Sequence, residues 1–465
     1  MKKFYLTTSI AYVNGAPHLG YALELVQADA TARYRRAEGD DVFFLTGTDE
    51  HGAKIARAAE AAGMAPRAYV DGNAEKFRAL KETLNLSWDD FIRTSDEARH
   101  FPNATMIWEK LVAAGDIYKK TYMGLYCVGH EAFVTEKDLV DGKCRDHGSA
   151  PEAIAEENHF FRLSKYAPEV KRRIESGELS IVPAGRAKEI VNFIDQGMED
   201  VSFSRPSKDL SWGIPVPGDA SQTMYVWCDA LANYLFPKGR WPADLHMIGK
   251  DILRFHALYW PAMLLSAKMP LPKALFVHGH ITLEGQKMSK TLGNAVDPAE
   301  LAKKYGADAV RYYLLREIPS TDDGDFSVAK FEERYTADLA NGLGNFAART
   351  GALAKKYGAS AVSAPDPLVA ESIAAAQSAV AAKMGEYKYH EALAALWELI
   401  AFANRHMNET KPWDASVAEP DKKIAIGNAL AILSAVGHLL APFLPETAEK
   451  IASGASAMLF PRLTF

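Results

Sequence analysis

The first sixty residues alternate short apolar runs with longer amphipathic stretches. Apolar, β-prone runs occupy KKFYLTTSI (residues 2–10) and DVFFLTG (41–47). Between them, YALELVQADATARYRRAEG (21–39) has helical apolar spacing, and AKIARAAEAAG (53–63) follows the second run as another helix. Strand, helix and strand in this order predict a βαβ unit, and therefore a parallel sheet with helices on its faces.

The pattern changes twice further along the chain. From Gly115 it becomes short strands and turns, which indicate an insertion, and the α/β pattern returns from TMYVWCDALANYLF (223–236) to ALFVHGHITL (274–283). After Asp338 the chain is rich in alanine and keeps helical apolar spacing over long segments. We therefore predict an α/β protein in which a Rossmann-like parallel-sheet domain is interrupted by an insertion and followed by a C-terminal α-helix bundle.

Composition narrows the class of protein. A chain of 465 residues is too long for one core. The net charge of -6, from 53 basic and 59 acidic residues, excludes a protein that coats nucleic acid indiscriminately but leaves room for local basic patches. The N-terminus reads as a strand, no apolar run is long enough to span a membrane, and three cysteines make no disulfide framework. These features predict a cytoplasmic protein without a membrane segment.

Two motifs at strand ends point to phosphate chemistry. PHLGYAL (17–23) stands where the first strand passes into the first helix, and a helix N-terminus offers N–H groups and a positive dipole end to a phosphate. His18 can add a donor, and Gly20 lets a flat ring approach the backbone. GQKMSKTLGNAVDP (285–298) reads as an exposed loop after a strand. Alone, each motif is compatible with ordinary solvated surface.

Together the motifs would bracket a nucleoside triphosphate. Lys287 and Lys290 would stabilise charge on the reacting phosphorus and on a pyrophosphate leaving group. Such chemistry needs positioning and charge stabilisation more than a nucleophilic side chain. This fits a chain with no Walker loop, nucleophile elbow or kinase signature.

The combination HLGY with KMSK resembles the paired signature of the class I aminoacyl-tRNA synthetases, although Tyr21 stands where that family usually has His. The resemblance is to the methionyl-tRNA synthetases in particular, and it runs in the family's order along essentially the whole chain. It implies that methionine and ATP form methionyl-adenylate and pyrophosphate, and that the methionyl group then passes to the 3′-terminal ribose of tRNA(Met), including the initiator. The further landmarks are TTSIAYVNGAPHLGY, FLTGTDEHG, VSFSR, YVWCDALANY, IGKDILRFHALYWPAML, FVHGHI and KPW.

The resemblance also implies which residues carry these roles. Asp49 and Arg205 would fix the charged ends of the amino acid, and a thioether packs well against aromatic rings. The methionine site would comprise Ile10, Tyr12, Asp49, Arg205, Trp227, Ala230, Leu231, Tyr234 and His278. The ATP site would comprise His18, Gly20, Tyr21, Gly249, Asp251, His256, Lys287, Met288, Ser289 and Lys290, of which His18, Lys287 and Lys290 would be catalytic. From periodicity alone, Trp227 and Tyr234 read as an ordinary core stripe.

The insertion carries two C-x-x-H pairs, Cys127 with His130 and Cys144 with His147. Four such ligands are the number that a closed tetrahedral zinc site requires. The resemblance implies one structural Zn²⁺ beside the Mg²⁺ that accompanies ATP. The alternative is a vestigial knuckle held by packing, because zinc-binding members more often have Cys at the place of His130.

The helical region would read the anticodon. Asn345 and Arg349 are four residues apart on one predicted helix face, and Trp413 follows a Pro that ends the preceding helix. Arg and Asn can hydrogen-bond splayed bases, and an exposed Trp can stack on one. All three match the anticodon-reading positions of the methionyl family. The alternative is that Trp413 is an interhelical wedge and Arg349 is solvated.

The predicted domains follow these assignments. They are the first half of the Rossmann catalytic domain at 1–114, the knuckle-bearing connective insertion at 115–222, the second half of the catalytic domain at 223–285, the KMSK loop and stem-contact region at 286–338, and the helical anticodon-binding domain at 339–465. A monomer is expected. The competing functions are a non-catalytic tRNA-binding scaffold, which an intact KMSK disfavours, and another class I specificity. The Leu, Ile and Val enzymes carry a larger editing insertion, and the Cys enzyme would need a metal near Trp227.

Overall fold

The computed structural model describes residues 1–129, 132–134, 138–146, 148–287, 295–454 and 459–463. The chain divides into two compact units, each made of segments that are distant in sequence. The first unit comprises Met1–Pro17, Asp41–Ala79 and Trp88–Val277. The second unit comprises His18–Asp40, Leu80–Ser87 and His278–Phe465.

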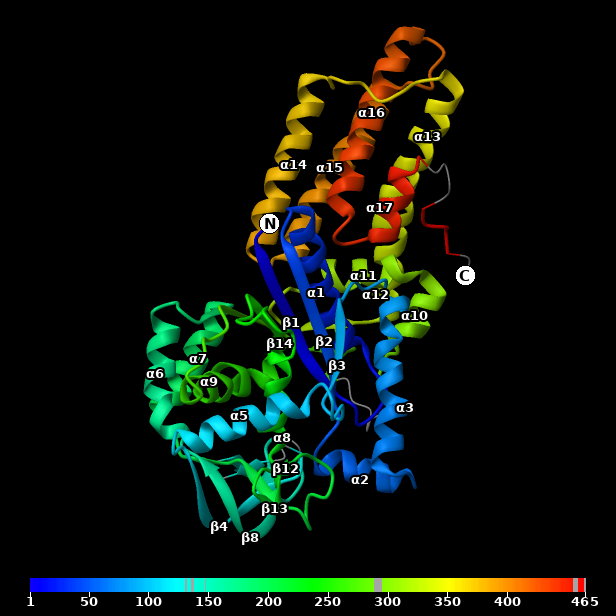
Figure 1. Cartoon of the computed structure of the whole chain (residues 1–465). Coiled ribbons are helices and arrows are strands. Elements are labelled where there is room, and N and C mark those ends of the chain that lie inside the picture. Colours follow the sequence, from blue (N-terminus) through cyan, green and yellow to red (C-terminus); the bar gives the residue numbers. More distant parts are fainter. Residues whose placement is uncertain (130–131, 135–137, 147, 288–294, 455–458, 464–465) are drawn as a thin grey trace. The chain divides into compact units, whose positions relative to one another are not determined.

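A six-stranded parallel sheet is the centre of the first unit (Figure 1). Its strand order is β3-β2-β1-β14-β15-β9. The bounds are β1 Lys3–Tyr12, β2 Asp41–Asp49, β3 Asp90–Arg93, β9 Ser180–Val182, β14 Leu245–Gly249 and β15 Ala274–His278. The predicted parallel sheet is thereby confirmed, and its strands read as nearly continuous apolar runs because both faces of such a sheet are buried. Gly47 is required where β2 meets β3, since a Cβ there would lie 2.0 Å from the carbonyl oxygen of Ile92.

Helices and antiparallel strands make up the rest of the first unit, and the antiparallel strands lie between β3 and β14 in the sequence. The helices are α2 Ala53–Ala61, α3 Pro66–Arg78, α5 Phe101–Ala113, α6 Leu163–Glu175, α7 Ala184–Asp195, α8 Val226–Ala230 and α9 Trp260–Ser266. The antiparallel strands are β4 Ile117–Cys127, β5 Ala132–Val134, β6 Leu139–Val140, β7 Lys143–Cys144, β8 Glu152–Phe161, β10 Val201–Ser202, β11 Ser204–Pro206, β12 Pro215–Val216 and β13 Asp219–Met224. The change of sequence pattern at Gly115 therefore corresponds to a change from parallel to antiparallel strand pairing.

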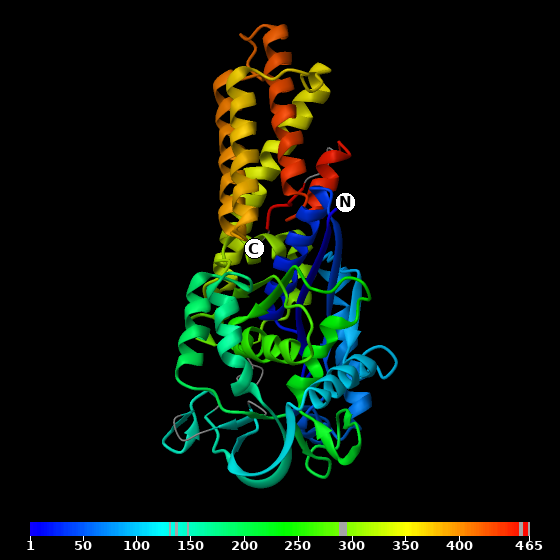
Figure 2. The ribbon, with the colours of Figure 1, turned by 60° about the vertical axis from the view of Figure 1, so that its left-hand side comes forward.

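Helices dominate the second unit. They are α1 Leu19–Ala37, α4 Leu80–Thr83, α10 Pro298–Tyr305, α11 Ala307–Arg316, α12 Val328–Arg334, α13 Asn345–Tyr357, α14 Pro367–Gly385, α15 Tyr389–Thr410, α16 Glu419–Leu440 and α17 Pro445–Ala452, with a small sheet of β16 Ile281–Leu283, β17 Gln286–Lys287 and β18 Gly324–Phe326. Figures 1 and 2 show α14, α15 and α16 running side by side as long helices, which confirms the predicted C-terminal helical region.

Among the described helices, α16 alone is long and apolar enough to cross a membrane, with a mean hydropathy of 1.5 over its most apolar window. More than half of that window, 56%, is buried inside the protein. It packs against α13, α15 and α17. These properties are those of the central helix of a bundle.

Candidate functional site

A pocket opens in the first unit beyond the carboxyl ends of β1, β2 and β14, where ligands of open parallel sheets bind. It has about 250 Å³ of unfilled space, part of it open to solvent. The pairing of β1 with β2 shifts register between Thr7 and Ile10, a kind of irregularity that redirects side chains next to binding sites. The lining residues are Ser9, Ile10, Asp49, Trp227, Ala230, Leu231, Asn233, Tyr234, Ile252 and His256.

One wall of the pocket is aromatic. Trp227 stacks on Phe255 with ring centroids 3.8 Å apart, and Tyr234 directs its hydroxyl at Nε2 of His256, 2.8 Å away. Nδ1 of His256 lies 3.0 Å from the carbonyl oxygen of Ile252. Nδ1–H therefore donates to that carbonyl, and Nε2 accepts from the tyrosine. Burial lowers the pKa of His256 to about 4, so at neutral pH this wall is uncharged.

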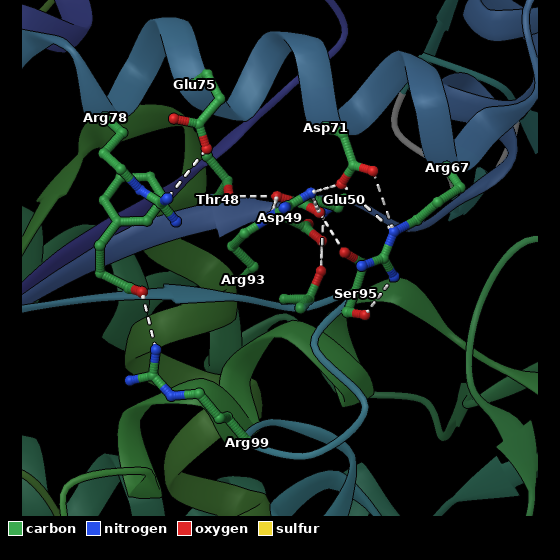
Figure 3. Close-up of polar contacts among 12 residues, drawn as sticks. Thr48, Asp49, Glu50, Arg67, Asp71, Glu75, Arg78, Arg93, Ser95 and Arg99 are labelled. Atoms are coloured by element: carbon green, nitrogen blue, oxygen red, sulfur yellow. Dashed lines mark hydrogen bonds and ion pairs between the residues drawn. The ribbon is translucent and has the colours of Figure 1, made fainter.

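Asp49 supplies the acidic group of the pocket and is backed by a polar network (Figure 3). Thr94 donates its hydroxyl to the carboxylate of Asp49 at 3.3 Å. The neighbouring carboxylate of Glu50 is fully buried and accepts from Arg93 at 2.7 and 2.8 Å. Burial alone would lower the pKa of Arg93, but its hydrogen bonds and ion pairs with Glu50 and Asp71 outweigh this and raise it. The end of β2 is thus held rigidly where Asp49 enters the pocket.

Three residues of the expected methionine site do not line this pocket. Tyr12 ends β1, with Nζ of Lys54 5.6 Å from its ring centroid. Arg205 donates from Nη1 to the hydroxyl of Ser202 and to the carbonyl of Ser204, each at 2.7 Å. His278 belongs to the second unit, where Nε2 lies 2.9 Å from the carboxylate of Glu24.

Conversely, the pocket contains residues that the motifs did not single out. Ser9, Asn233 and Ile252 line it, and His256, expected beside adenosine, lines it as well. A signal existed for Ser9, Asn233 and Ile252, because each stands inside a quoted landmark and next to a named residue. The landmarks alone did not show which of their residues would face a pocket.

The start of α1 and the chain that follows the lysine motif meet within the second unit. His18 caps α1, and its Nδ1 accepts from the Gly20 N–H at 3.1 Å. A Cβ at position 20 would lie 3.0 Å from the imidazole, which favours glycine there. The Leu19 N–H donates to the carbonyl of Val296 at 3.0 Å. Val296 follows the lysine motif closely in the chain, so the start of α1 and the chain just after that motif are neighbours.

The remaining nucleotide-site residues are divided between the units. Gly249 ends β14, and Asp251 lies in the short helical turn after it, both in the first unit. Tyr21 lies in the first turn of α1, and β17 ends at Lys287, both in the second unit. The rest of the lysine motif, Met288-Ser289-Lys290, lies outside the described residues.

The candidate anticodon residues meet on the helical bundle. The guanidinium of Arg349 lies 4.8 Å from the ring centroid of Trp413 and donates to the Asn408 side chain at 3.1 Å. The Trp413 side chain is exposed, at 42% of its full area. Asn345 begins the same helix, α13, one turn before Arg349. The surface of the bundle therefore presents part of the Trp413 ring with the guanidinium of Arg349 beside it.

Two of the four candidate metal ligands are described. Cys127 and Cys144 are buried in one small core with Val134. This burial fits a pair of thiolate ligands and equally fits a packed knuckle. His130 and His147 lie outside the described residues. Among the residues that are described, no group of three or more His, Cys, Asp or Glu side chains is placed to hold a metal.

Comparisons with known proteins agree with this geometry. The family described as tRNA synthetases class I (M) matches residues 4–146 and 134–351. The methionine–tRNA ligase of Brucella melitensis biotype 1 is 43% identical over 97% of this chain and 91% of that protein. The methionine–tRNA ligase of Caldanaerobacter subterraneus is 44% identical over 97% of this chain and 73% of that protein.

A solved structure shows the same likeness in three dimensions. The Mycobacterium tuberculosis methionyl-tRNA synthetase in complex with methionyl-adenylate superposes with a TM-score of 0.91. It is 40% identical, with 97% of this chain and 93% of that chain covered. Fold and sequence therefore agree over nearly the whole length of both proteins.

Proposed function

The chain belongs to the methionyl-tRNA synthetases of class I and is a methionine–tRNA ligase, and from this premise we propose that the pocket of the first unit receives the methionine side chain. The observation that carries the proposal is the coexistence of an uncharged aromatic wall with one carboxylate at the end of β2. The wall of Trp227, Tyr234 and His256 suits a thioether, because sulfur packs favourably against ring edges. Asp49 would hold the ammonium group.

The reaction consumes methionine, ATP with Mg²⁺, and tRNA, and no covalent enzyme intermediate is required. We propose that Ile10, Ala230 and Leu231 complete the methionine pocket, and that Tyr12, Arg205 and His278 contact the amino acid when it is bound. The support for these three is their match to the family's positions. Arg205 would then fix the carboxylate of methionine before it attacks the α-phosphorus of ATP.

We propose that the start of α1 and the lysine motif hold the triphosphate. The support is the hydrogen bond from Leu19 to Val296, which joins the start of α1 to the chain just after the lysine motif. Free N–H groups at a helix start and two lysines would stabilise the charge that develops on pyrophosphate as it leaves. The residues of this ATP site would be His18, Gly20, Tyr21, Gly249, Asp251, Lys287, Met288, Ser289 and Lys290, with His18, Lys287 and Lys290 in catalytic roles.

Amino-acid-dependent ATP–pyrophosphate exchange tests these assignments. Across the twenty amino acids, exchange should depend on methionine, require Mg²⁺ and not require tRNA. Lys290→Ala should lower the exchange rate by roughly 10² or more, the scale for one charge-stabilising donor, with little change in methionine affinity. Near-full exchange by that variant would show that the loop is only solvated surface, and equal exchange with leucine would refute the methionine pocket.

We propose that Asn345, Arg349 and Trp413 read the anticodon of tRNA(Met), elongator and initiator alike. The support is the exposed Trp413 ring with Arg349 beside it. One ring face can carry a splayed base while the guanidinium offers N–H donors to base edges. In this arrangement selection of the tRNA takes place on the helical bundle, and the amino acid is activated elsewhere.

Trp413→Ala should weaken aminoacylation of tRNA by roughly tenfold to a hundredfold, because a base–aromatic stack is worth about 1–3 kcal/mol. Exchange without tRNA should stay near the wild-type rate. Trp397 is a half-buried tryptophan on α15 whose ring centroid lies 4.5 Å from that of Tyr312 on α11, and it serves as the control. Trp397→Ala should lower the melting temperature and should not reduce aminoacylation selectively. A parallel fall of exchange and aminoacylation in Trp413→Ala would contradict the anticodon role.

We propose that the insertion holds one structural zinc ion through Cys127, His130, Cys144 and His147. The support is the shared burial of the two cysteines and the C-x-x-H spacing. Protein purified without chelator should contain close to one zinc per chain, and Cys144→Ser should reduce this content. Metal analysis that finds none would favour a knuckle held by packing alone.

The five-part division predicted from the sequence, at 1–114, 115–222, 223–285, 286–338 and 339–465, remains our proposal for the functional domains. We also propose that the protein acts in the cytoplasm as a monomer. Sedimentation at micromolar concentration checks the second point, and a dimer mass would refute it.

A further inference from the structure

A buried carboxylate lies between two histidines behind the pocket wall. Oδ2 of Asp229 is 2.6 Å from Nδ1 of His51, and Oδ1 is 2.6 Å from Nε2 of His100. The three side chains are almost fully buried, at 1%, 4% and 0% exposure for Asp229, His51 and His100. A carboxylate only accepts, so both facing ring nitrogens carry the hydrogen. None of these residues lines the pocket.

The three residues connect separate parts of the first unit. Asp229 lies on α8 between Trp227 and Ala230, both of which line the pocket. His51 lies two residues after Asp49, in the loop that follows β2, and His100 is the N-cap residue of α5. The carboxylate thus joins the aromatic wall to the loop that follows Asp49, the acidic group at the end of β2.

The loop around His51 makes aromatic contacts as well, and the ring of His51 meets that of Phe101 on α5 edge-on with centroids 5.8 Å apart. Trp212 donates its indole N–H to the carbonyl of Glu50, and its ring meets His51 edge-on at 5.4 Å. These contacts hold the loop to the segment before β12. Helix α8 has only five residues, too few for its own hydrogen bonds to fix its position. The hydrogen bond from His51 to Asp229 joins α8 directly to the loop after β2.

Electrostatics make this link rigid. A buried charge is tolerated only when it is paired and hydrogen-bonded. Burial by itself would raise the pKa of Asp229, but the charge of His51 and the hydrogen bonds from both imidazoles outweigh it and lower the pKa to about 2. The carboxylate stays ionised at neutral pH, with each oxygen committed to one imidazole. Any shift of α8 relative to the loop would stretch a charge-assisted hydrogen bond.

We propose that Asp229 is a positioning residue for amino-acid activation: through His51 and His100 it sets the separation between the aromatic wall and Asp49. This inference rests on the proposed assignment of the pocket to methionine. If the wall and the acidic group are held at the wrong spacing, the thioether and the ammonium cannot both be satisfied. A purely structural bond would instead contribute to folding without any preference for methionine over ATP.

Steady-state exchange kinetics on the full chain distinguish the two roles. Asp229→Asn keeps the shape but loses the charge and one acceptor. It should raise KM for methionine roughly tenfold to a hundredfold, the scale for small misplacements near a reacting group, and change KM for ATP less than about twofold. Asp116→Asn is the matched control. Asp116 is equally buried, accepts from Lys165 and Ser266 at 2.7 Å each, and does not line the pocket. It should lose stability without a selective change in KM.

Variants of the two histidines test the proposal even if Asp229→Asn folds poorly. His51→Asn and His100→Gln place an amide N–H where Nδ1 and Nε2 now donate, and both should keep KM for methionine near the wild-type value. His51→Ala and His100→Ala remove the donor and should raise it. Equal KM values in the alanine and amide variants would overturn the proposal, as would a parallel rise of KM for methionine and ATP.

One further variant separates this inference from the pocket assignment. Trp227→Ala removes part of the aromatic wall itself. It should therefore raise KM for methionine whether or not Asp229 has a positioning role. If Trp227→Ala has no effect, the pocket assignment fails. If Trp227→Ala raises KM and the Asp229 and histidine variants do not, the pocket assignment stands and the positioning role of Asp229 is wrong.

Discussion

Asp49→Ala is expected to lower kcat/KM for methionine by about 10²–10³-fold. Asp49 is only 6% exposed and is the one carboxylate among the residues that line the described pocket. Removing one partner of a buried, hydrogen-bonded charge pair costs about 2–5 kcal/mol, and each 1.4 kcal/mol is tenfold in binding. The loss should appear mainly in methionine binding, because the lysines and the helix start that would hold ATP are unchanged.

Two comparisons make the Asp49 result specific. Methioninol keeps the ammonium group and lacks the carboxylate, so its inhibition constant should rise in Asp49→Ala by a factor similar to the change for methionine. Glu75, on the neighbouring helix in Figure 3, pairs with Arg78 at 3.0 Å and is exposed. Glu75→Gln should leave both constants unchanged. If methioninol inhibits Asp49→Ala with the same inhibition constant as the wild type, the ammonium group binds elsewhere.

Arg311→Met is expected to cost the second unit about 3–5 kcal/mol of folding free energy, the usual cost of breaking a buried ion pair. Arg311 on α11 and Asp29 on α1 are both fully buried, with Nη1 and Oδ2 2.7 Å apart. The guanidinium also donates to the carbonyl oxygens of Phe443 at 2.7 Å and Pro442 at 3.1 Å. One side chain thus joins α1, whose N-cap residue is His18, to the loop between α16 and α17.

The pKa of Asp29 supports the same expectation. Burial would raise it, but the charges of Arg311 and Arg33 and the hydrogen bond from Ser87 outweigh burial and lower the pKa below its usual 3.8. A depressed folded-state pKa contributes stability above the unfolded pKa, and that contribution is lost as the pH falls through the folded pKa. Arg311→Met should therefore be compared with the wild type at neutral pH, where the full contribution of the pair is present.

Thermal unfolding measures the effect of Arg311→Met. A unit of this size loses about 2–4 °C per kcal/mol, so a fall of roughly 6–20 °C is expected. The control is Arg334→Met, because Arg334 is a partly exposed arginine of the same unit, paired with Glu317 at 2.8 Å and Asp338 at 3.3 Å. Exposed pairs contribute only about 0–1 kcal/mol. Equal shifts in the two variants would mean that Arg311 contributes no more than a surface pair.

Local patterns were enough to predict the architecture. The apolar runs at residues 2–10 and 41–47 became β1 and β2, and the helical spacing after each became α1 and α2. Parallel strands buried on both faces are apolar over their length, and bundle helices repeat apolar residues at helical spacing. Both signals lie within short windows of sequence. The family was likewise identifiable, because HLGY and KMSK are contiguous motifs.

Local sequence patterns predicted the candidate site only in part. Trp227 and Tyr234, seven residues apart, read equally well as a core stripe, and the family resemblance selected them. The structure places both on one pocket wall with Ile10 and Asp49. Sequence spacing could not indicate that His256 would share this wall, because its partner Tyr234 is 22 residues away and belongs to another element.

By itself, the sequence determined the parallel sheet, the helical C-terminal region and the family. Only the tertiary structure decided which polar groups meet. Asp229 finds His51 across 178 residues and His100 across 129, and Asp29 meets Arg311 from another helix. Asp229 and His51 stand inside quoted landmarks, but nothing in either landmark indicates that the two residues pair. Such pairs are selected by burial, because a charge removed from water must find its counterpart wherever the fold brings one.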